Sequence, residues 1–301
     1  HGCVAMPLES QTTIRAVLVE RDLSGFISAR PTDIPHPGDP ARGELLVRPD
    51  FVGICGSDLE QLHGGMPETF RISYPHVLGH EWSGTVVAVG DEVTGHAVGD
   101  RVIGHGDLGN NNWFGVTVDG AMAELFRVPA SMCFAVPEGI AQDAAAVIEP
   151  LACVLAGLRK VPFLSAADVV TVHGLGAIGL SAVMLAAESG ALVRAVDPSA
   201  LRRQKALDLG ATLAVDPTVD SVEQYGLANL VIEASGSPGA QAAAISGAAP
   251  RATVLMMGVS KPRDVPVSLG LIQQRDLRVF SSTGAPAEIW EAALRLVDRA
   301  Q

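Results

Sequence analysis

The stretch VVTVHGLGAIGLSAVMLAAESG, residues 169–190, decides the fold of the C-terminal half of the chain. It opens with β-branched and apolar residues that predict a buried strand, and it continues as a helix-forming segment. Between the two lie Gly174, Gly176 and Gly179 in the spacing GxGxxG. The next predicted strand, LVRAVD, ends in Asp197, close to the offset of about 20 residues expected for a ribose-binding acid. This order predicts a strand–helix–strand unit that binds a dinucleotide.

Each glycine of this turn has a predicted role in a Rossmann domain. Gly174 makes the turn, Gly176 lets backbone amides approach the pyrophosphate, and Gly179 allows the helix to pack closely on the strand. The residues between them belong to the same cofactor-binding loop, namely Leu175, Ala177 and Ile178.

Asp197 favours NAD as the cofactor, because a carboxylate accepts hydrogen bonds from the ribose hydroxyls and repels the 2′-phosphate of NADP. Arg202 and Arg203 follow shortly after, and either could instead bind a phosphate. Arg202 is therefore included among the cofactor-binding candidates. Three later segments follow apolar strands and are expected beside the cofactor, with Val259 and Ser282 among its contacts: EASGSPG (233–239), MMGVS (256–260) and SSTG (281–284).

The pattern of apolar and turn-forming residues changes near residue 150. Up to that point short β-rich runs alternate with Gly, Pro and Asp, which predicts a compact β-rich domain over residues 1–150. From 151 to 285 apolar strands alternate with helices, which predicts a doubly wound parallel sheet covered on both faces. Residues 286–301 read as a helix returning towards the first domain. The predicted fold class is α/β.

Composition limits the possible partners. The chain has 301 residues, 48% of them hydrophobic, which is enough for two domains with substantial cores. A net charge of −12 opposes binding to nucleic acid. No apolar run reaches the roughly 18–20 residues of a membrane span, and the four widely spaced cysteines indicate reduced thiols. These features predict a soluble, cytoplasmic protein with a small-molecule substrate. The segment HGCVA before Met6 is interpreted as an expression tag, so His1 and Cys3 are excluded from the candidate site residues.

The β-rich domain also carries the donors of a metal site. Cys55 lies in FVGICGSD (51–58), and His80 and Glu81 lie in YPHVLGHEWSG (74–84). A thiolate, an imidazole and carboxylates are typical zinc ligands, and catalytic zinc needs three of them. The segment IEPLACV (148–154) offers either Glu149 or Cys153 as the third ligand.

Six motifs occur in an order that resembles the zinc-dependent medium-chain alcohol and polyol dehydrogenases, including the sorbitol, threonine and cyclitol dehydrogenases. They are GICGSD, YPHVLGHEWSG, VGDRV, DGAMAE, IEPLACV and HGLGAIG. The resemblance implies a GroES-like catalytic domain before the Rossmann domain. It also implies Zn²⁺ and NAD as cofactors, and hydride transfer from a secondary hydroxyl of a polyol, sugar or cyclitol. The sequence departs from many members in the interval 103–118, which has no cysteine where they hold a structural zinc lobe.

The resemblance also implies roles for single residues. Cys55, His80 and Glu149 match the zinc ligands of the polyol dehydrogenases, and the adjacent Glu81 matches a carboxylate that supports the metal or exchanges into its shell. Asp58 matches the carboxylate that orients the ligating histidine.

Two further residues match a path for the substrate proton. Ser57 matches the hydroxyl that takes the proton of the alcohol, and His63 matches a histidine that passes it to solvent. Ser57 could instead only cap a helix, and His63 could only complement the dipole of that helix.

Two other functions are compatible with the fold. One is a zinc-free NADPH quinone or enoyl reductase, against which the combination of Cys55, His80 and Glu149 argues. The other is a dinucleotide-binding protein without turnover, against which Ser57 argues. The apolar segment LRVFSSTG (277–284) predicts an edge strand that pairs with a second copy, so the chain is expected to form a homodimer or homotetramer.

Overall fold

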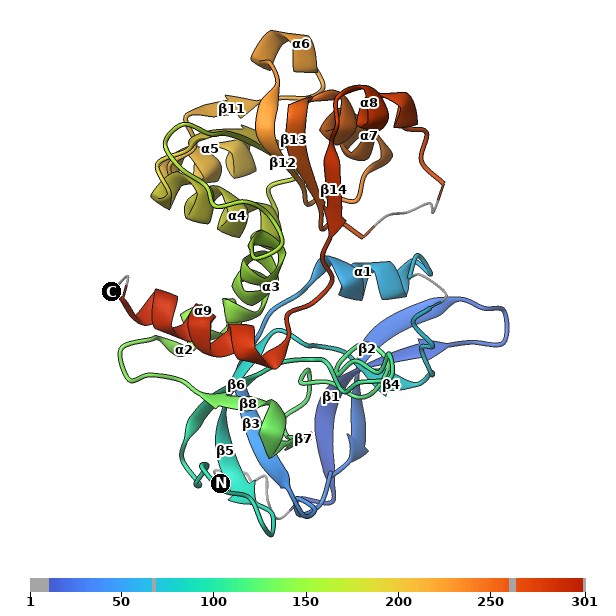
Figure 1. Cartoon of the computed structure of the whole chain (residues 1–301). Helices are drawn as coiled ribbons and strands as arrows, with labels where there is room; N and C mark the ends of the chain where they lie inside the picture. Colours follow the sequence, from blue (N-terminus) through green and yellow to red (C-terminus); the bar gives the residue numbers. More distant parts are fainter. Residues whose placement is uncertain (1–10, 67–68, 260–263, 300–301) are drawn as a thin grey trace. The chain divides into compact units, whose positions relative to one another are not determined.

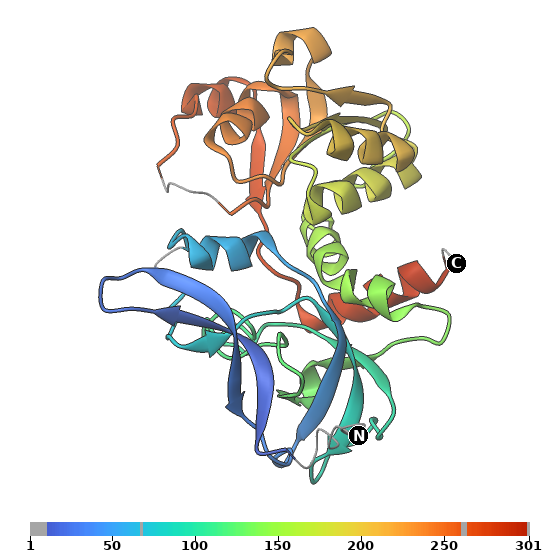
Figure 2. The same cartoon turned by 180° about the vertical axis from the view of Figure 1, so that it is seen from behind.

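A computed structural model describes residues 11–66, 69–259 and 264–299, so that His1, Cys3 and Ser260 lie outside the described residues. The chain divides into two compact units. One consists of His1–Glu149 together with Pro286–Gln301, and the other of Pro150–Ala285. Figure 1 labels most of their elements and Figure 2 gives the reverse view.

The first unit is built on two antiparallel sheets (Figure 1). The smaller sheet has the order β2-β1-β4, from Ile27–Pro35, Thr13–Arg21 and His76–Val77. The larger has the order β7-β3-β5-β6-β8, from Phe126–Pro129, Glu44–Val52, Trp82–Val89, Arg101–Gly104 and Cys133–Ala135. These sheets give the GroES-like part of the predicted α/β fold class.

Aromatic side chains hold the core of the larger sheet together. Trp82 is 2% exposed, and its ring lies 4.9 Å from that of Phe126 in an edge-to-face arrangement and 6.3 Å from that of Phe114. Such pairs contribute about 0.5–1.5 kcal/mol each beyond the burial of their area. Trp82 follows Glu81 directly, so its burial fixes the chain where the metal-site motif ends.

Among the described residues, three α-helices belong wholly to the first unit: α1 (Gly56–Leu62), α2 (Gln142–Ala146) and α9 (Ala287–Arg299). The helix α9 buries one stripe, which includes Ile289, Trp290 and Ala293. The Trp290 ring stacks on Phe134 with a centroid distance of 5.9 Å and an interplanar angle of 4°. The last segment of the chain therefore packs into the first unit.

The second unit is a six-stranded parallel sheet in the order β11-β10-β9-β12-β13-β14 (Figure 1). The strands are Leu213–Val215, Leu192–Val196, Val169–His173, Ala228–Glu233, Ala248–Met256 and Arg278–Ser281. The helices are α3 (Ile148–Leu158), which begins in the first unit, α4 (Ala177–Glu188), α5 (Ala200–Asp208), α6 (Val222–Tyr225), α7 (Pro238–Ser246) and α8 (Leu269–Gln274).

Helices cover both faces of this sheet. Val154 of α3, Val183 of α4 and Ala206 of α5 belong to one core cluster. Ile245 of α7 and Leu271 of α8 belong to the cluster on the opposite face. The predicted doubly wound parallel sheet is therefore confirmed.

The carboxyl ends of the strands lie in one register line. Val196 pairs with His173, His173 with Glu233, Glu233 with Met256, and Met256 with Ser281. The loops that follow these strands therefore start at the same edge of the sheet, which is where parallel sheets bind ligands.

The strand β14 forms one edge of the sheet, and Val279 and Phe280 on it are exposed. Among the described residues, no helix has the length and apolar character that crossing a membrane requires.

Candidate active site

The first unit contains a compact group of metal-ligating side chains at the start of α1. Cys55 is the N-cap of this helix, and its backbone N–H donates to Asp58 Oδ2 at 2.8 Å. The backbone N–H of Asp58 in turn donates to the Cys55 side chain, which completes a capping box. This reciprocal pair fixes the backbone of Cys55 and holds Asp58, 2% exposed, beside it.

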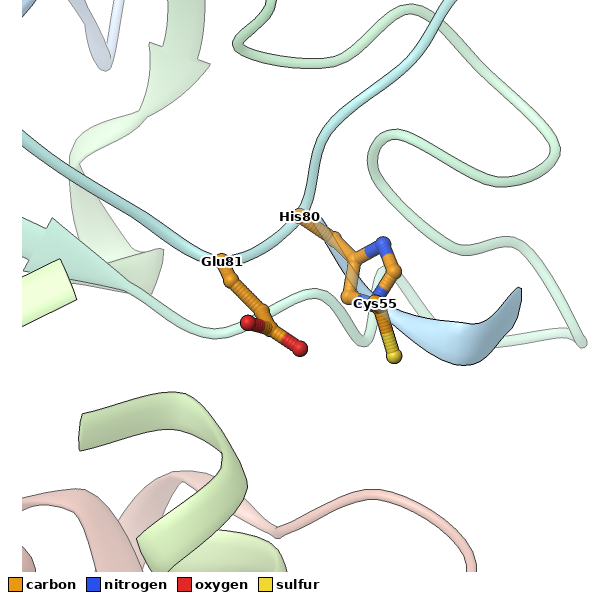
Figure 3. A group of neighbouring side chains, drawn as sticks. All are labelled: Cys55, His80 and Glu81. Carbon is orange, nitrogen blue, oxygen red and sulfur yellow. The ribbon is translucent and has the colours of Figure 1, made fainter. Parts of the chain in front are cut away.

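His80 and Glu81 reach the same place from the segment that leads into β5. The Gly53 N–H donates to the Glu81 carbonyl at 2.6 Å, which ties this segment to the one that carries Cys55. One ligand atom each of Cys55, His80 and Glu81 lies within 4.8 Å of the others (Figure 3). The His80 side chain is 11% exposed and Glu81 is 5% exposed, so solvent reaches both only slightly.

The charge around His80 favours a cation. Burial alone would lower the pKa of His80, but the Cys55 side chain and the carboxylates of Glu149 and Asp58 raise that pKa to about 10. The imidazole therefore holds a proton at neutral pH when no other cation is present. A metal ion that binds to a histidine displaces such a proton.

Glu81 experiences the same concentration of negative charge. Burial is the largest cause and the carboxylate of Glu149 the next, and together they raise the pKa of Glu81 to about 6. Glu149 lies in the first turn of α3 and is half-buried. It is not part of the 4.8 Å group, although its charge acts on both His80 and Glu81. The site therefore offers a thiol, an imidazole and two carboxylates, and the two carboxylates repel each other. These donors fit a divalent ion such as Zn²⁺.

The structure places Ser57 beside His80, whereas His63 lies at the opposite end of α1. Ser57 Oγ lies 3.5 Å from His80 Nε2, and His80 Nδ1 lies 3.8 Å from Asp58 Oδ1. His63 is the C-cap of α1 and its side chain is exposed. Its backbone N–H donates to the Leu59 carbonyl at 3.0 Å.

The second unit holds the glycine-rich turn in the predicted place. Gly174 directly follows β9 and has a φ of +84°, which disfavours other residues. A Cβ on Gly179 would collide with the Gly174 carbonyl, so close packing of α4 requires glycine there. A Cβ on Gly176, the N-cap of α4, would meet no atom within 4 Å. Leu175, Ala177 and Ile178 complete the turn, and the open space at Gly176 fits a pyrophosphate at a helix N-terminus.

Asp197 is held rigidly beside this turn. Its Oδ2 accepts from the Leu175 N–H and its Oδ1 from the Ser199 N–H, each at 2.8 Å. Arg203 donates to the Asp197 carbonyl at 2.7 Å and pairs with Asp216 at 3.0 Å. Arg202 is 57% exposed and lies 3.7 Å from Asp197 Oδ2, so it is the less engaged of the two arginines.

A pocket of about 470 Å³ lies next to Gly174 and Asp197. Its walls combine apolar side chains, such as Val196, Val222 and Ala243, with the polar residues His173, Ser235, Ser237 and Tyr225. An apolar slot with polar groups at its edges fits a purine nucleoside.

The other two predicted cofactor contacts follow β13 and β14. The Val259 carbonyl packs so closely on Gly236 that a Cβ there would collide with it, and the Val259 side chain is 43% exposed. Ser282 is 7% exposed, and its Oγ accepts from Lys160 Nζ at 3.2 Å. Both residues lie in loops that begin at the carboxyl edge of the parallel sheet.

Comparison with known proteins agrees with both units. Residues 41–138 match the family model of the alcohol dehydrogenase GroES-like domain, and residues 177–299 match that of the zinc-binding dehydrogenase. Sorbitol dehydrogenase of Gallus gallus is 30% identical over 296 residues, which covers 87% of this chain and 80% of that protein. The chain belongs to the zinc-type medium-chain alcohol dehydrogenase family.

Two solved structures of similar proteins contain different dinucleotide cofactors. A zinc-binding dehydrogenase from Sinorhizobium meliloti bound to NADP has a TM-score of 0.82 and 31% identity, with 96% of this chain and 90% of that chain covered. The alcohol dehydrogenase RspB from Escherichia coli, complexed with NADH, has a TM-score of 0.81 and 27% identity, with 96% and 89% covered. The family therefore includes similar proteins that bind either dinucleotide.

Sequence reasoning overlooked two groups of this medium-chain dehydrogenase. His173 and Tyr225 line the nucleoside pocket, although neither was a candidate. The signal for His173 was a titratable residue at the end of an otherwise apolar strand, VVTVH. Tyr225 gave no signal, because its short helix is far from the glycine turn in sequence.

Proposed function

We propose that this protein is an NAD-dependent zinc dehydrogenase that oxidises a secondary hydroxyl of a polyol, sugar or cyclitol. The observation that carries the proposal is the group of Cys55, His80 and Glu81 with the Ser57 hydroxyl at 3.5 Å from His80. A zinc-free reductase has no need for this donor set, and a binding protein has no need for the hydroxyl.

Cys55, His80 and Glu149 are the proposed zinc ligands, with Glu81 as a carboxylate that supports the ion or exchanges into its shell. When bound, zinc supplies a Lewis acid that lowers the pKa of a substrate hydroxyl, and NAD supplies the hydride acceptor. Cys55 and Glu149 as anions would neutralise the two charges of the ion, whereas recruitment of Glu81 would leave the site anionic and weaken its Lewis acidity.

The chain's own residues then handle the proton. Ser57 is proposed to take the hydroxyl proton as a relay: its Oγ accepts that proton while its own hydroxyl proton leaves towards solvent. Its Oγ lies 3.5 Å from Nε2 of the proposed ligand His80. Asp58 orients His80 from the side of Nδ1, the usual arrangement for a ligating histidine. His63, exposed at the end of α1, is proposed to pass the proton to solvent.

NAD is the proposed cofactor because Asp197 lies where a ribose diol would bind, and each of its oxygens retains a lone pair after accepting one backbone N–H. A 2′-phosphate would meet this buried carboxylate directly. Arg202, whose side chain is 57% exposed, lies nearby and would have to overcome that repulsion for NADP to bind well.

A homodimer or homotetramer is the proposed assembly. The edge strand β14 exposes Val279 and Phe280, and an exposed apolar edge is a liability unless another strand covers it. Light scattering at micromolar concentration should give at least twice the 31.2 kDa of one chain, and a monomer would refute the proposal.

The experiment that tests the function combines metal analysis with a screen for NAD reduction. We expect one zinc per chain at the catalytic site and formation of NADH with at least one sugar alcohol, aminocyclitol or simple secondary alcohol. A metal-free protein that oxidises NADPH with quinones or enones would contradict the proposal, and so would a protein that binds NAD without any turnover.

A further inference from the structure

His173 is a buried titratable residue that the proposed chemistry does not use. It is the last residue of β9, directly before Gly174, and it is 2% exposed. His173 lines the 470 Å³ pocket beside Asp197, and its Nε2 is buried without a hydrogen-bond partner among the described residues. An unpaired buried nitrogen is costly to a fold, which makes a partner outside the chain a natural explanation.

The strands on either side of His173 do not supply that partner. On one side its register neighbour is Val196, which is apolar. On the other side it is Glu233, whose Oε1 accepts from the Ser235 N–H at 2.8 Å, the Ser235 hydroxyl at 2.7 Å and the Gly236 N–H at 3.0 Å. Its Oε2 accepts from the Gly236 N–H at 3.3 Å, so both carboxylate oxygens are engaged in the turn that follows β12. Neither neighbouring residue is hydrogen-bonded to the imidazole, and the space that His173 lines is the pocket.

The imidazole is neutral in this environment. Burial is the only cause acting on it, and it lowers the pKa of His173 to about 4. Asp197, Asp220 and Tyr225 line the same pocket, but none of them offsets the effect of burial. A neutral imidazole offers one donor and one acceptor, and rotation about its broad χ2 torsion selects which ring edge faces a ligand.

We propose that His173 positions the dinucleotide by a hydrogen bond from one of its ring nitrogens to the adenosine moiety in this pocket. The inference rests on the proposed function, since it needs a dinucleotide at the Gly174 turn. It adds a recognition contact on the floor of the pocket to the ribose contact of Asp197.

The first test is calorimetric titration with ADP-ribose, which carries the adenosine half without the nicotinamide. His173→Phe keeps an aromatic ring but removes both nitrogens, and we expect it to raise the Kd for ADP-ribose and for NAD by the same factor of about five. His173→Asn retains a donor and an acceptor and should recover part of the loss. Thr171→Val is the matched control, because Thr171 lies on the same face of β9 and its Oγ1 is also unpaired, yet it does not line the pocket. Its Kd should equal that of the wild type.

A second readout distinguishes recognition from a general packing role. The ¹⁵N resonances of the His173 ring, assigned by their loss in His173→Phe, should shift on addition of ADP-ribose as the hydrogen bond forms. Unchanged resonances together with an unchanged Kd for the variants would overturn the inference while leaving the dinucleotide site intact. Failure of the wild type to bind ADP-ribose or NAD would instead refute the proposed function. If His173→Phe does not fold, the resonances of the wild type and the affinity of His173→Asn still decide.

Discussion

Replacement of His173 by phenylalanine should flatten the loss of stability in acid. The pKa of His173 is lowered by burial from 6.5 to about 4, whereas the unfolded chain keeps the ordinary value. Above pH 6.5 both states are neutral and the histidine contributes nothing. As the pH falls below 6.5 the unfolded state binds a proton that the folded state does not, so the free energy of unfolding falls.

The size of the effect follows from the shift. One pKa unit corresponds to 1.36 kcal/mol, so the full loss is about 3 kcal/mol near pH 4 and about 2 kcal/mol has occurred by pH 5. His173→Phe cannot take up the proton. As the pH falls from 7.5 to 5, its free energy of unfolding should therefore decrease by about 2 kcal/mol less than that of the wild type.

Urea unfolding followed by circular dichroism measures the difference. Because all three tryptophans, Trp82, Trp113 and Trp290, lie in the first unit, their fluorescence would miss the relevant strand. Hydrogen exchange of the amides of β9 supplies a local readout. Equal losses for the wild type and His173→Phe between pH 7.5 and 5 would refute the reasoning, and Thr171→Val should parallel the wild type.

Five further substitutions test the two sites. Gly176→Ala should change the free energy of unfolding by no more than about 0.5 kcal/mol but weaken NAD binding about tenfold, because the methyl group enters the space proposed for the cofactor. Gly179→Ala should instead lower the free energy of unfolding, measured by denaturation, by about 3 kcal/mol, because its Cβ clashes with the Gly174 carbonyl. Glu149→Ala should lower the zinc content or the rate by about 10–100-fold with NAD affinity intact, and Cys153→Ala should cost only about 1 kcal/mol of stability; zinc bound to the Cys153 sulfur in a crystal structure would reverse this assignment. Asp197→Ser should reduce the ratio of kcat/KM for NAD over NADP at least about tenfold, and a wild-type enzyme that already prefers NADP would contradict the proposed cofactor.

The Rossmann half of the fold could be predicted because its signals are local. A continuous apolar strand, the glycine spacing and the position of Asp197 all lie within 30 residues, and each corresponds to a backbone requirement such as the positive φ of Gly174. The arrangement of the β-rich unit was less accessible. Its strands pair over long sequence separations, for example β3 with β7, and the alternation of residues along a strand does not specify which partner it has.

The metal site could be predicted as a set of residues but not as a geometry. The order of the motifs indicated that Cys55, His80, Glu81 and Glu149 belong to one site. That the ligand atoms of the first three lie within 4.8 Å of one another, and that Glu149 is outside this group, depends on tertiary packing. His76 in the same motif is a contrasting case. It is 3% exposed and its Nε2 lies 2.7 Å from Gln61 Oε1, so it serves the packing of α1. Residue type alone does not distinguish it from His80, whereas its position in the motif does.

Zinc held by Cys55 and its neighbours is proposed to be needed for oxidation of an alcohol by NAD. The most direct test is to remove the metal with a chelator and to titrate Zn²⁺ back while NADH formation is followed with a substrate found in the screen. We predict no turnover without metal, a linear rise in rate and saturation at one zinc per chain, together with no recovery in Cys55→Ala. A rate that is independent of zinc, or that recovers fully in Cys55→Ala, would contradict the account.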